Sequence, residues 1–381
     1  MKTKPYSIRK ASQSITVMLY FVALVIHNLY HVTAIDLLWY LILITCFLLG
    51  TFRKKIIIYK HLVGLVLLFV LSGVLNILFV GNTSVFDIVF LVFFAGIYQL
   101  LVDDELDERF ILAAIYLDCL LVAFTIIKTG LGKPIFGELS NNFVSVLLFL
   151  PTIVYYIRQE YYHKKISILP ALAVTLTCFL AMGRAGIITS AVLLFFIVLY
   201  ATFSDKNWDN ARRLALFRVG VICTAFVLLG VFLLFLDKLL AITVFARFSR
   251  YGMYGTGRMG IWEEYISTMA KDVKSILLGV EYSQLPLMVR YRNNLHNSFL
   301  NMHADYGILV LFYIIYMFAS NCFRCIRAGK WIYLSVMTVL FVRACTDKLF
   351  GGGAAATCIL IFVLLHIRDK GLWKERLGKS R

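Results

Sequence analysis

The most regular feature of the chain is a series of apolar runs separated by short polar segments. Each run is about 20 residues long, which matches the hydrocarbon core of a bilayer. Lipid offers no partner to a free backbone N–H or C=O group, so each run predicts a helix that satisfies its own hydrogen bonds. We expect twelve spans, near residues 14–31, 34–51, 61–80, 84–102, 110–127, 141–157, 166–182, 185–203, 215–235, 296–318, 331–347 and 353–367.

The polar segment over residues 236–295 is longer than the others and carries a second hydrophobic pattern. Its apolar residues recur at helical spacing from Ile261 onward, which predicts a short amphipathic helix. Such a helix can lie in the outer leaflet of the membrane. The same apolar face can instead pack onto the helical bundle. That face comprises Ile261, Trp262, Tyr265, Ile266, Met269 and Val273.

The composition leaves no room for a sizeable soluble domain. Hydrophobic residues make up 61% of the 381 positions and charged residues only 15%, whereas a soluble chain has about a quarter charged residues. The sequence therefore predicts an all-α polytopic membrane protein embedded in a lipid bilayer. We divide it into transmembrane helices over 1–235, an extracytoplasmic loop over 236–295, further helices over 296–367 and a basic tail over 368–381.

The net charge of +17 predicts membrane orientation rather than nucleic-acid binding, because basic loops of membrane proteins mostly set topology. With twelve spans, 25 of the 38 lysines and arginines fall on the side of the N-terminus, and eight of the other 13 fall in the long loop. Basic residues in short loops stay in the cytoplasm. We therefore expect both termini to be cytoplasmic and the long loop to lie outside a cytoplasmic (inner) membrane.

Arg184 lies in the sequence Met182-Gly183-Arg184-Ala185-Gly186, between two apolar runs with almost no linker. An arginine at such a junction can simply extend its side chain to the membrane interface. The flanking glycines also allow a tight turn and close approach of a ligand. A guanidinium group there suits a phosphate, which it binds through two parallel hydrogen bonds.

Further basic residues gather before the tenth predicted span. Arg258, Arg290, Arg292 and His296 fall within about forty residues of the long loop and its end. Like charges repel one another unless an anion joins them. Their clustering therefore favours an anionic ligand at the outer face. A lone histidine is more often a packed residue than a catalyst, but the nearby arginines make His296 a candidate catalytic residue.

The tenth span begins with polar residues that can share one helix face by i+3 and i+4 steps, namely His296, Ser298, Asn301 and Asp305. Polar groups at the outer end of a span often line a cavity. We assign Asn297, Asn301, Asp305 and Arg343 as residues that line a pocket, although Asp347 can instead neutralise Arg343. The sequence contains no motif of ATP or zinc hydrolysis, so we predict no cofactor and no metal.

Several short motifs together resemble the signature of the O-antigen polymerase and ligase superfamily, which includes the Wzy-type polysaccharide repeat-unit polymerases. The resemblance covers residues 180–310, about a third of the chain. The residues that carry it are Gly183-Arg184-Ala185-Gly186, Gly257-Arg258 to Trp262, Leu278-Gly279, and His296-Asn297 through Asp305-Tyr306-Gly307.

The resemblance implies a GT-C-like fold and a metal-independent glycosyltransferase that uses polyprenyl-diphosphate-linked oligosaccharides as donor and acceptor. Arg184 and Arg258 match family arginines thought to hold the diphosphate. His296 matches a family histidine taken as a base or a positioning group. Arg290 and Arg292 lie where the family often has further basic residues. A chain-length regulator and a flippase are expected partners.

The sequence departs from the family pattern near Gly307. Asp305 and Tyr306 stand where many members have a glutamate before the glycine, and Ile308-Leu309-Val310 replaces the second glycine and the threonine that ligases carry. These departures favour a polymerase of O-antigen or capsule repeat units over a glycan ligase. A transporter of lipid-linked sugar is the other alternative. A transporter would need ionisable groups near mid-membrane and often has inverted repeats. The charged cluster here lies at the outer boundary instead, and we find no internal repeat in the sequence.

Overall fold

The structure is a computed structural model that describes residues 8–30, 32–51, 60–103, 106–131, 133–136, 141–203, 215–216, 219–220, 258–290 and 294–346. These residues form helices and no β-strand, which confirms the all-α prediction for the described chain. The longer helices are α1 (Ile8–Leu29), α2 (Thr33–Thr51), α3 (Lys60–Phe79), α4 (Val85–Leu101), α5 (Glu108–Thr129), α6 (Phe143–Tyr161), α7 (Leu169–Leu180), α8 (Arg184–Phe203), α12 (Arg258–Met269), α15 (Ser298–Arg327) and α16 (Trp331–Thr346). Shorter pieces are α13 (Val273–Leu278), the 3-10 turn η2 (Tyr282–Gln284) and α14 (Pro286–Arg290).

Six of the described helices are long and apolar enough to cross a membrane: α1, α2, α3, α5, α8 and α15. α4, α7 and α16 are shorter apolar helices. Together with α6, these nine helices coincide in sequence with ten of the twelve predicted spans. The predicted spans 215–235 and 353–367 lie outside the described residues, apart from residues 215–216 and 219–220. The count of twelve, the GT-C-like arrangement and the membrane orientation stay predictions.

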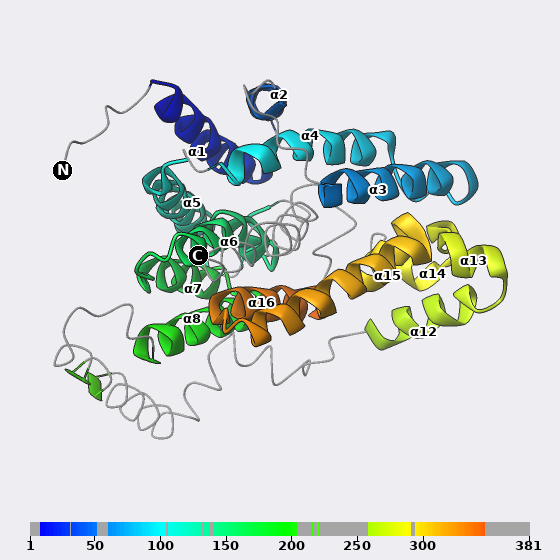
Figure 1. The fold of residues 1–381 in the computed structure, drawn as a ribbon. Helices are drawn as coiled ribbons and strands as arrows, with labels where there is room; N and C mark the ends of the chain where they lie inside the picture. Colours follow the sequence, from blue (N-terminus) through cyan, green and yellow to red (C-terminus); the bar gives the residue numbers. More distant parts are fainter. Residues whose placement is uncertain are drawn as a thin grey trace, which may run out of the picture.

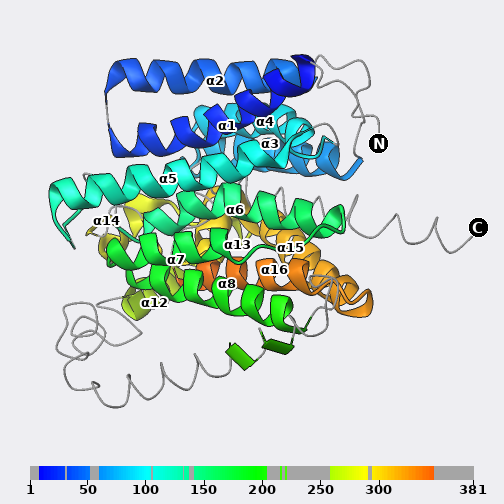
Figure 2. The same ribbon diagram turned by 90° about the vertical axis from the view of Figure 1, so that its left-hand side faces the viewer.

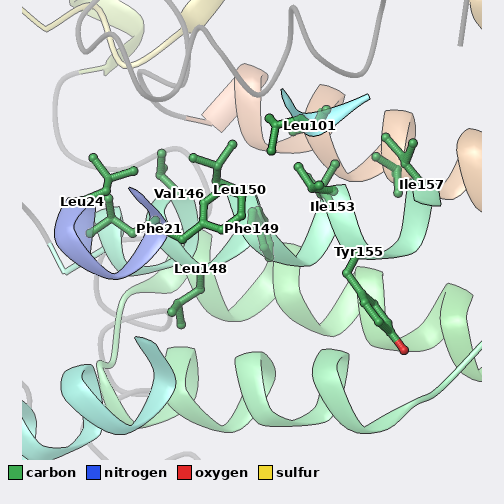
Figure 3. Close-up of a cluster of buried hydrophobic side chains, with 14 of the residues drawn as sticks. Phe21, Leu24, Leu101, Val146, Leu148, Phe149, Leu150, Ile153, Tyr155 and Ile157 are labelled. Carbon is green, nitrogen blue, oxygen red and sulfur yellow. The ribbon is translucent and has the colours of Figure 1, made fainter. Parts of the chain in front are cut away.

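The helices lie side by side in a bundle whose centre is α6 (Figures 1 and 2). Every residue of α6 from Val144 to Glu160 is buried. Its helix packs against α5, α7, α8, α16 and α1. Figure 3 shows its apolar side chains, such as Phe149 and Ile153, beside Phe21 and Leu24 of α1 and Leu101 at the end of α4.

The outer faces of the bundle are apolar, as expected for a surface in contact with lipid. α5 buries one face through residues such as Ile111, Ile115 and Val122, while Leu120 is 65% and Ile127 is 76% exposed on the other. Soluble monomers rarely expose large contiguous apolar patches. The six long apolar helices and their exposed apolar faces together indicate a helical membrane protein.

Polar residues at helix starts explain where several helices begin. Ser84 and Asp87 form a capping box at the start of α4, in which each side chain accepts the backbone N–H of the other residue. Asp107 accepts the N–H of Arg109 at the start of α5. Asn297 accepts the N–H groups of Phe299 and Leu300 at the start of α15. Each oxygen satisfies donors that have no partner within the helix.

Arg158, near the end of α6, joins three segments through a buried guanidinium group. It donates to the carbonyl oxygens of Leu101 (2.9 Å), the last residue of α4, and of Asp103 (2.8 Å) and Leu106 (2.8 Å) in the α4–α5 connection. Glu108 lies 3.9 Å from its Nε and also accepts from Gln159 and Lys164. The carbonyl groups after α4 are therefore satisfied by a side chain from α6 rather than by water.

α15 is a broken helix. Its backbone leaves helical geometry at Gly307, where φ is 78° and ψ is −178°. The first part, Ser298–Tyr306, packs with α12, η2 and α14 around a small core that is separate from the main one. We call residues 258–290 together with residues 294–306 the loop unit. Its core contains Ile261, Tyr265, Val280, Leu285, Met288, Leu295 and Ala304.

The loop unit contains the predicted amphipathic helix. α12 begins at Arg258 and ends at Met269. Ile261 and Tyr265 are buried in the small core, with Trp262 and Met269 against it, whereas Ile266 and Val273 are exposed. The apolar face of α12 is therefore divided between the small core and the exterior, and its position relative to the membrane stays a prediction.

We expect Arg158→Met to lower the free energy of unfolding by about 3–5 kcal/mol, because three buried carbonyl groups lose their donor. Thermal unfolding in detergent measures this loss. Arg109→Met is the matched control: its side chain is 78% exposed against 2% for Arg158, so its effect should stay below about 1 kcal/mol. Equal destabilisation by the two substitutions would contradict a structural role for Arg158.

Candidate functional site

The turn that carries Arg184 is fixed by two asparagines at the start of α6. Asn141 donates from Nδ2 to the carbonyl oxygen of Ala181 (2.9 Å), and Asn142 accepts the N–H of Ala185 on Oδ1 (3.1 Å). Gly183 approaches this backbone so closely that an added Cβ would lie 2.8 Å from backbone atoms of Asn141 and Asn142. The glycine of the predicted motif is therefore needed for close contact between the α7–α8 turn and α6.

Arg343 of α16 meets the same start of α6. Its side chain is buried, with Nε donating to Ser145 Oγ (3.2 Å) and Nη2 donating to the carbonyl oxygen of Asn142 (3.2 Å). Arg343 was predicted to line a pocket. The structure places it between α16 and α6, against the same Asn142 that bonds the turn carrying Arg184, and the pocket itself stays a prediction. Asp347, its alternative partner, lies outside the described residues.

Arg258 reaches the end of the same helix α16. Its Nη1 donates to the carbonyl oxygen of Thr346 (2.7 Å), and the Thr346 hydroxyl donates to the carbonyl oxygen of Arg343 (3.1 Å). Arginine at a helix C-terminus satisfies a carbonyl that the helix leaves free. A chain of short contacts thus runs from Arg258 through the end of α16 and Asn142 to the Arg184 turn.

His296 lies two residues before the start of α15, next to the capping residue Asn297. The residue has a φ of 50°, in the left-handed region, and its N–H donates to Asn294 Oδ1 (2.7 Å). The carbonyl oxygen of Leu295 accepts from Trp262 Nε1 (2.6 Å), one helical turn after Arg258 in α12. Phe299, in the first turn of α15, contacts the ring of Phe341 in α16, with centroids 5.7 Å apart. His296 therefore lies at the same end of the bundle as the three arginines.

The predicted polar face of α15 is realised only in part. Because His296 lies outside the helix, it does not continue the face of Ser298, Asn301 and Asp305. Asn301 is fully buried and donates from Nδ2 to the carbonyl oxygen of Asn297 (2.9 Å). Asn297 is the helix cap. These two asparagines thus shape the entry into α15.

Asp305 accepts a hydrogen bond from the hydroxyl of Tyr282. Burial, with the adjacent carboxylate of Asp305, raises the pKa of Tyr282 well above its usual value. Burial also raises the pKa of Tyr265, whose hydroxyl lies 2.6 Å from His303 Nδ1. His303 Nε2 donates to the carbonyl oxygen of Ile276 (2.7 Å), so Nδ1 is the acceptor for Tyr265. Both tyrosines remain hydrogen-bond donors that hold the first part of α15 to α12 and η2.

Two predicted residues cannot be placed. The side chain of Arg290, at the end of α14, and all of Arg292 lie outside what the structure describes. Their proposed role beside the diphosphate stays a prediction.

Sequence reasoning missed several polar residues that the structure places in prominent positions. Asn76 is buried in α3, and Asn142 begins α6. Asp118 is fully buried midway along α5, and neither of its carboxyl oxygens has a hydrogen-bond partner among the described residues. The available signal was a single polar residue inside or beside an apolar run. A single sequence does not show which group such a polar side chain binds, so its role could not be inferred.

The arrangement is suited to binding an anion. α6, α8, α12 and α15 all begin at this end of the bundle, as the contacts from Asn142 to Ala185, from Arg258 to Thr346 and from Phe299 to Phe341 require. Helix N-termini carry a partial positive charge that attracts anions. Arginines supply further positive charge and directed donors. Within the described residues, no group of three or more His, Cys, Asp or Glu side chains is arranged to hold a metal ion.

Comparison with known proteins assigns no family. No protein-family model matches the sequence, and a search of curated proteins finds no significant match.

We expect Gly183→Ala to destabilise the protein by about 1–3 kcal/mol, because the added methyl group overpacks the start of α6. Thermal unfolding in detergent measures the change. Gly64→Ala, also in an apolar segment, is the control: a Cβ there meets nothing within 4 Å. Alanine is a better helix former than glycine, so this control should be neutral or slightly stabilising. A neutral Gly183→Ala would argue against the close packing of the Arg184 turn.

Proposed function

We propose that the protein polymerises lipid-diphosphate-linked oligosaccharide repeat units into a surface polysaccharide, O-antigen or capsule, at the outer face of the cytoplasmic membrane. It is proposed to act as a glycosyltransferase without a metal, as the resemblance implies. Donor and acceptor are both polyprenyl-diphosphate-linked oligosaccharides. The site consists of Arg184, Arg258 and His296, with Arg343 behind them.

The observation that carries this proposal is the convergence of residues from four helices at one end of the bundle. Arg184 begins α8, Arg258 begins α12, Arg343 lies in the last turn of α16, and His296 precedes α15. The contacts through Asn142 and Thr346 keep these elements together. A diphosphate leaving group carries the negative charge that such an arrangement attracts.

The proposed reaction is a single displacement at the anomeric carbon of the donor sugar. An acceptor hydroxyl forms the new glycosidic C–O bond while the bond between the sugar and the diphosphate breaks. The diphosphate departs on its polyprenyl chain, and Arg184 and Arg258 stabilise its growing negative charge. His296 accepts the proton of the acceptor hydroxyl, a role that suits imidazole. Without a carboxylate nucleophile, one displacement inverts the anomeric configuration.

A ligase would use the same site to move a finished glycan onto a different acceptor. The departures at Asp305, Tyr306 and Ile308–Val310 favour a polymerase. The products distinguish the two reactions. A polymerase gives a ladder of lengthening chains, whereas a ligase transfers a chain of fixed length.

The burial of Asp118 midway along α5 favours a transporter. Its buried carboxyl group lies ten residues along α5 from Glu108 and eleven from Thr129. It is therefore about 15 Å from either end of the helix. Ionisable groups at such depth often mark ion or substrate pathways. A flippase for lipid-linked sugar is accordingly the second candidate function.

Reconstitution distinguishes these functions. Liposomes that contain the purified protein are supplied with the lipid-diphosphate repeat unit, without nucleotide or added metal, and the products are separated by length. We expect a ladder that His296→Ala abolishes. Lipid-linked sugar that crosses the bilayer without lengthening would instead identify a transporter, and in that case Asp118→Asn should slow the crossing.

We further expect Arg184→Ala to reduce kcat/KM for the lipid-linked donor by about 10²–10³-fold, the usual effect of removing one donor to a developing charge. Arg109→Ala is the control, because Arg109 lies in the first turn of α5, where its exposed side chain pairs with Asp107. Initial rates of chain lengthening measure both. Full activity in the Arg184 variant would show that this arginine does not bind the diphosphate.

A further inference from the structure

The break in α15 removes helical partners from the carbonyl groups just before it. A regular helix would bond the carbonyl oxygen of Ala304 to the N–H group four residues later, but the chain turns away at Gly307. The break lies against α13: a Cβ on Gly307 would be 2.4 Å from the carbonyl oxygen of Leu277. A Cβ on Gly279 would likewise lie 2.6 Å from the carbonyl oxygen of Ala304. Buried carbonyl groups at such a break must find other donors.

The donors come from α3 and the turn that follows it, more than two hundred residues away in sequence. Asn76 Nδ2 donates to the carbonyl oxygens of Ala304 (2.8 Å) and Leu278 (3.0 Å). Asn82 Nδ2 donates to the carbonyl oxygens of Ala304 (2.9 Å) and Val280 (2.8 Å). The hydroxyl of Thr83 donates to the carbonyl oxygen of Asp305. Three side chains thus bind both sides of the contact between α13 and α15.

The acceptor atoms of the same asparagines complete the connection. Asn76 Oδ1 accepts the N–H groups of Thr83 (2.9 Å) and Asn82 (3.2 Å), which fixes the shape of the α3–α4 turn. Asn82 Oδ1 accepts the N–H of Tyr282 (3.0 Å), at the start of η2. Each amide therefore serves as donor and acceptor at once. Few side chains can replace asparagine in this double role.

The position of His296 depends on the direction of the first part of α15. The eight residues from Ala304 to His296 correspond to about 12 Å of helix. A tilt of about 5° at the break would move His296 by about 1 Å, and a displacement of that size can cost an enzyme about 100-fold in rate. The asparagines bind α15 at the pivot of this tilt.

We propose that Asn76 and Asn82 are positioning residues that set the direction of the first part of α15 and so hold His296 in place. This inference rests on the proposed function for its catalytic consequence. Its structural part is independent of any activity. Neither asparagine is expected to contact the substrate.

The test uses the full-length protein in detergent and in liposomes. Asn76→Ala and Asn82→Ala are compared with Asn28→Ala, a control in which the lost bond, from Nδ2 to the carbonyl oxygen of Leu24 (2.8 Å), stays within α1. Asn82 is only partly buried, so its variant should fold even where Asn76→Ala does not. Hydrogen–deuterium exchange is followed over residues 79–85 and 278–284, and initial rates of chain lengthening are measured against donor concentration.

We expect exchange over both segments to become about tenfold faster in the two variants and to stay unchanged in the control. Their kcat should fall about 10–100-fold, with a smaller change in KM, because the diphosphate is held mainly by arginines on α8 and α12. Faster exchange with unchanged kcat would overturn the positioning role. Unchanged exchange would show that the two asparagines do not hold these segments together. If the unsubstituted protein lengthens no chains, the proposed function fails. The exchange result still shows whether Asn76 and Asn82 hold the α3–α4 turn to α13 and α15.

Discussion

A buried carbonyl group that has lost its helical partner must find another donor, and this requirement determines how the segments of the protein meet. At one end of the bundle Arg158 donates to three carbonyl groups of the α4–α5 connection. At the other end Arg258 donates to the last residue of α16, and Arg343 donates to the residue before α6. Asn76 and Asn82 donate to the break in α15. In each case the donor and the carbonyl group come from different segments of the chain, so the hydrogen bonds that satisfy the backbone also fix the tertiary arrangement.

The same requirement gives the sequence motifs a physical meaning. Gly183, Gly279 and Gly307 all stand where one backbone approaches another too closely for a Cβ. Two of them, Gly279 and Gly307, also have positive φ angles. The glycines of the motifs therefore mark contacts between distant segments. The contact at Gly183 shapes the turn that carries the neighbouring Arg184.

The sequence predicted the helices well, because apolar runs of about 20 residues leave few alternatives in lipid. Because successive spans run in opposite directions, it also predicted that Arg184, Arg258, Arg343 and His296 lie at the same end of the bundle. It did not predict the break at Gly307, since the run from Ile308 to Phe318 continues without interruption. Nor did it predict the roles of Asn76, Asn142 and Arg158, whose partners are backbone N–H or carbonyl groups. Nearly every residue has both groups, so such a partner leaves no signal in the residue types.

The proposed chemistry follows from the positive charge at that end of the bundle, and the structure of a substrate complex tests it most directly. The protein would be imaged by electron cryomicroscopy in lipid nanodiscs with a non-hydrolysable polyprenyl diphosphate-sugar analogue. We predict that the diphosphate lies between Arg184 and Arg258, with the sugar facing His296. A diphosphate bound elsewhere, such as along α5 near Asp118, would contradict the assignment of this end of the bundle as the active site.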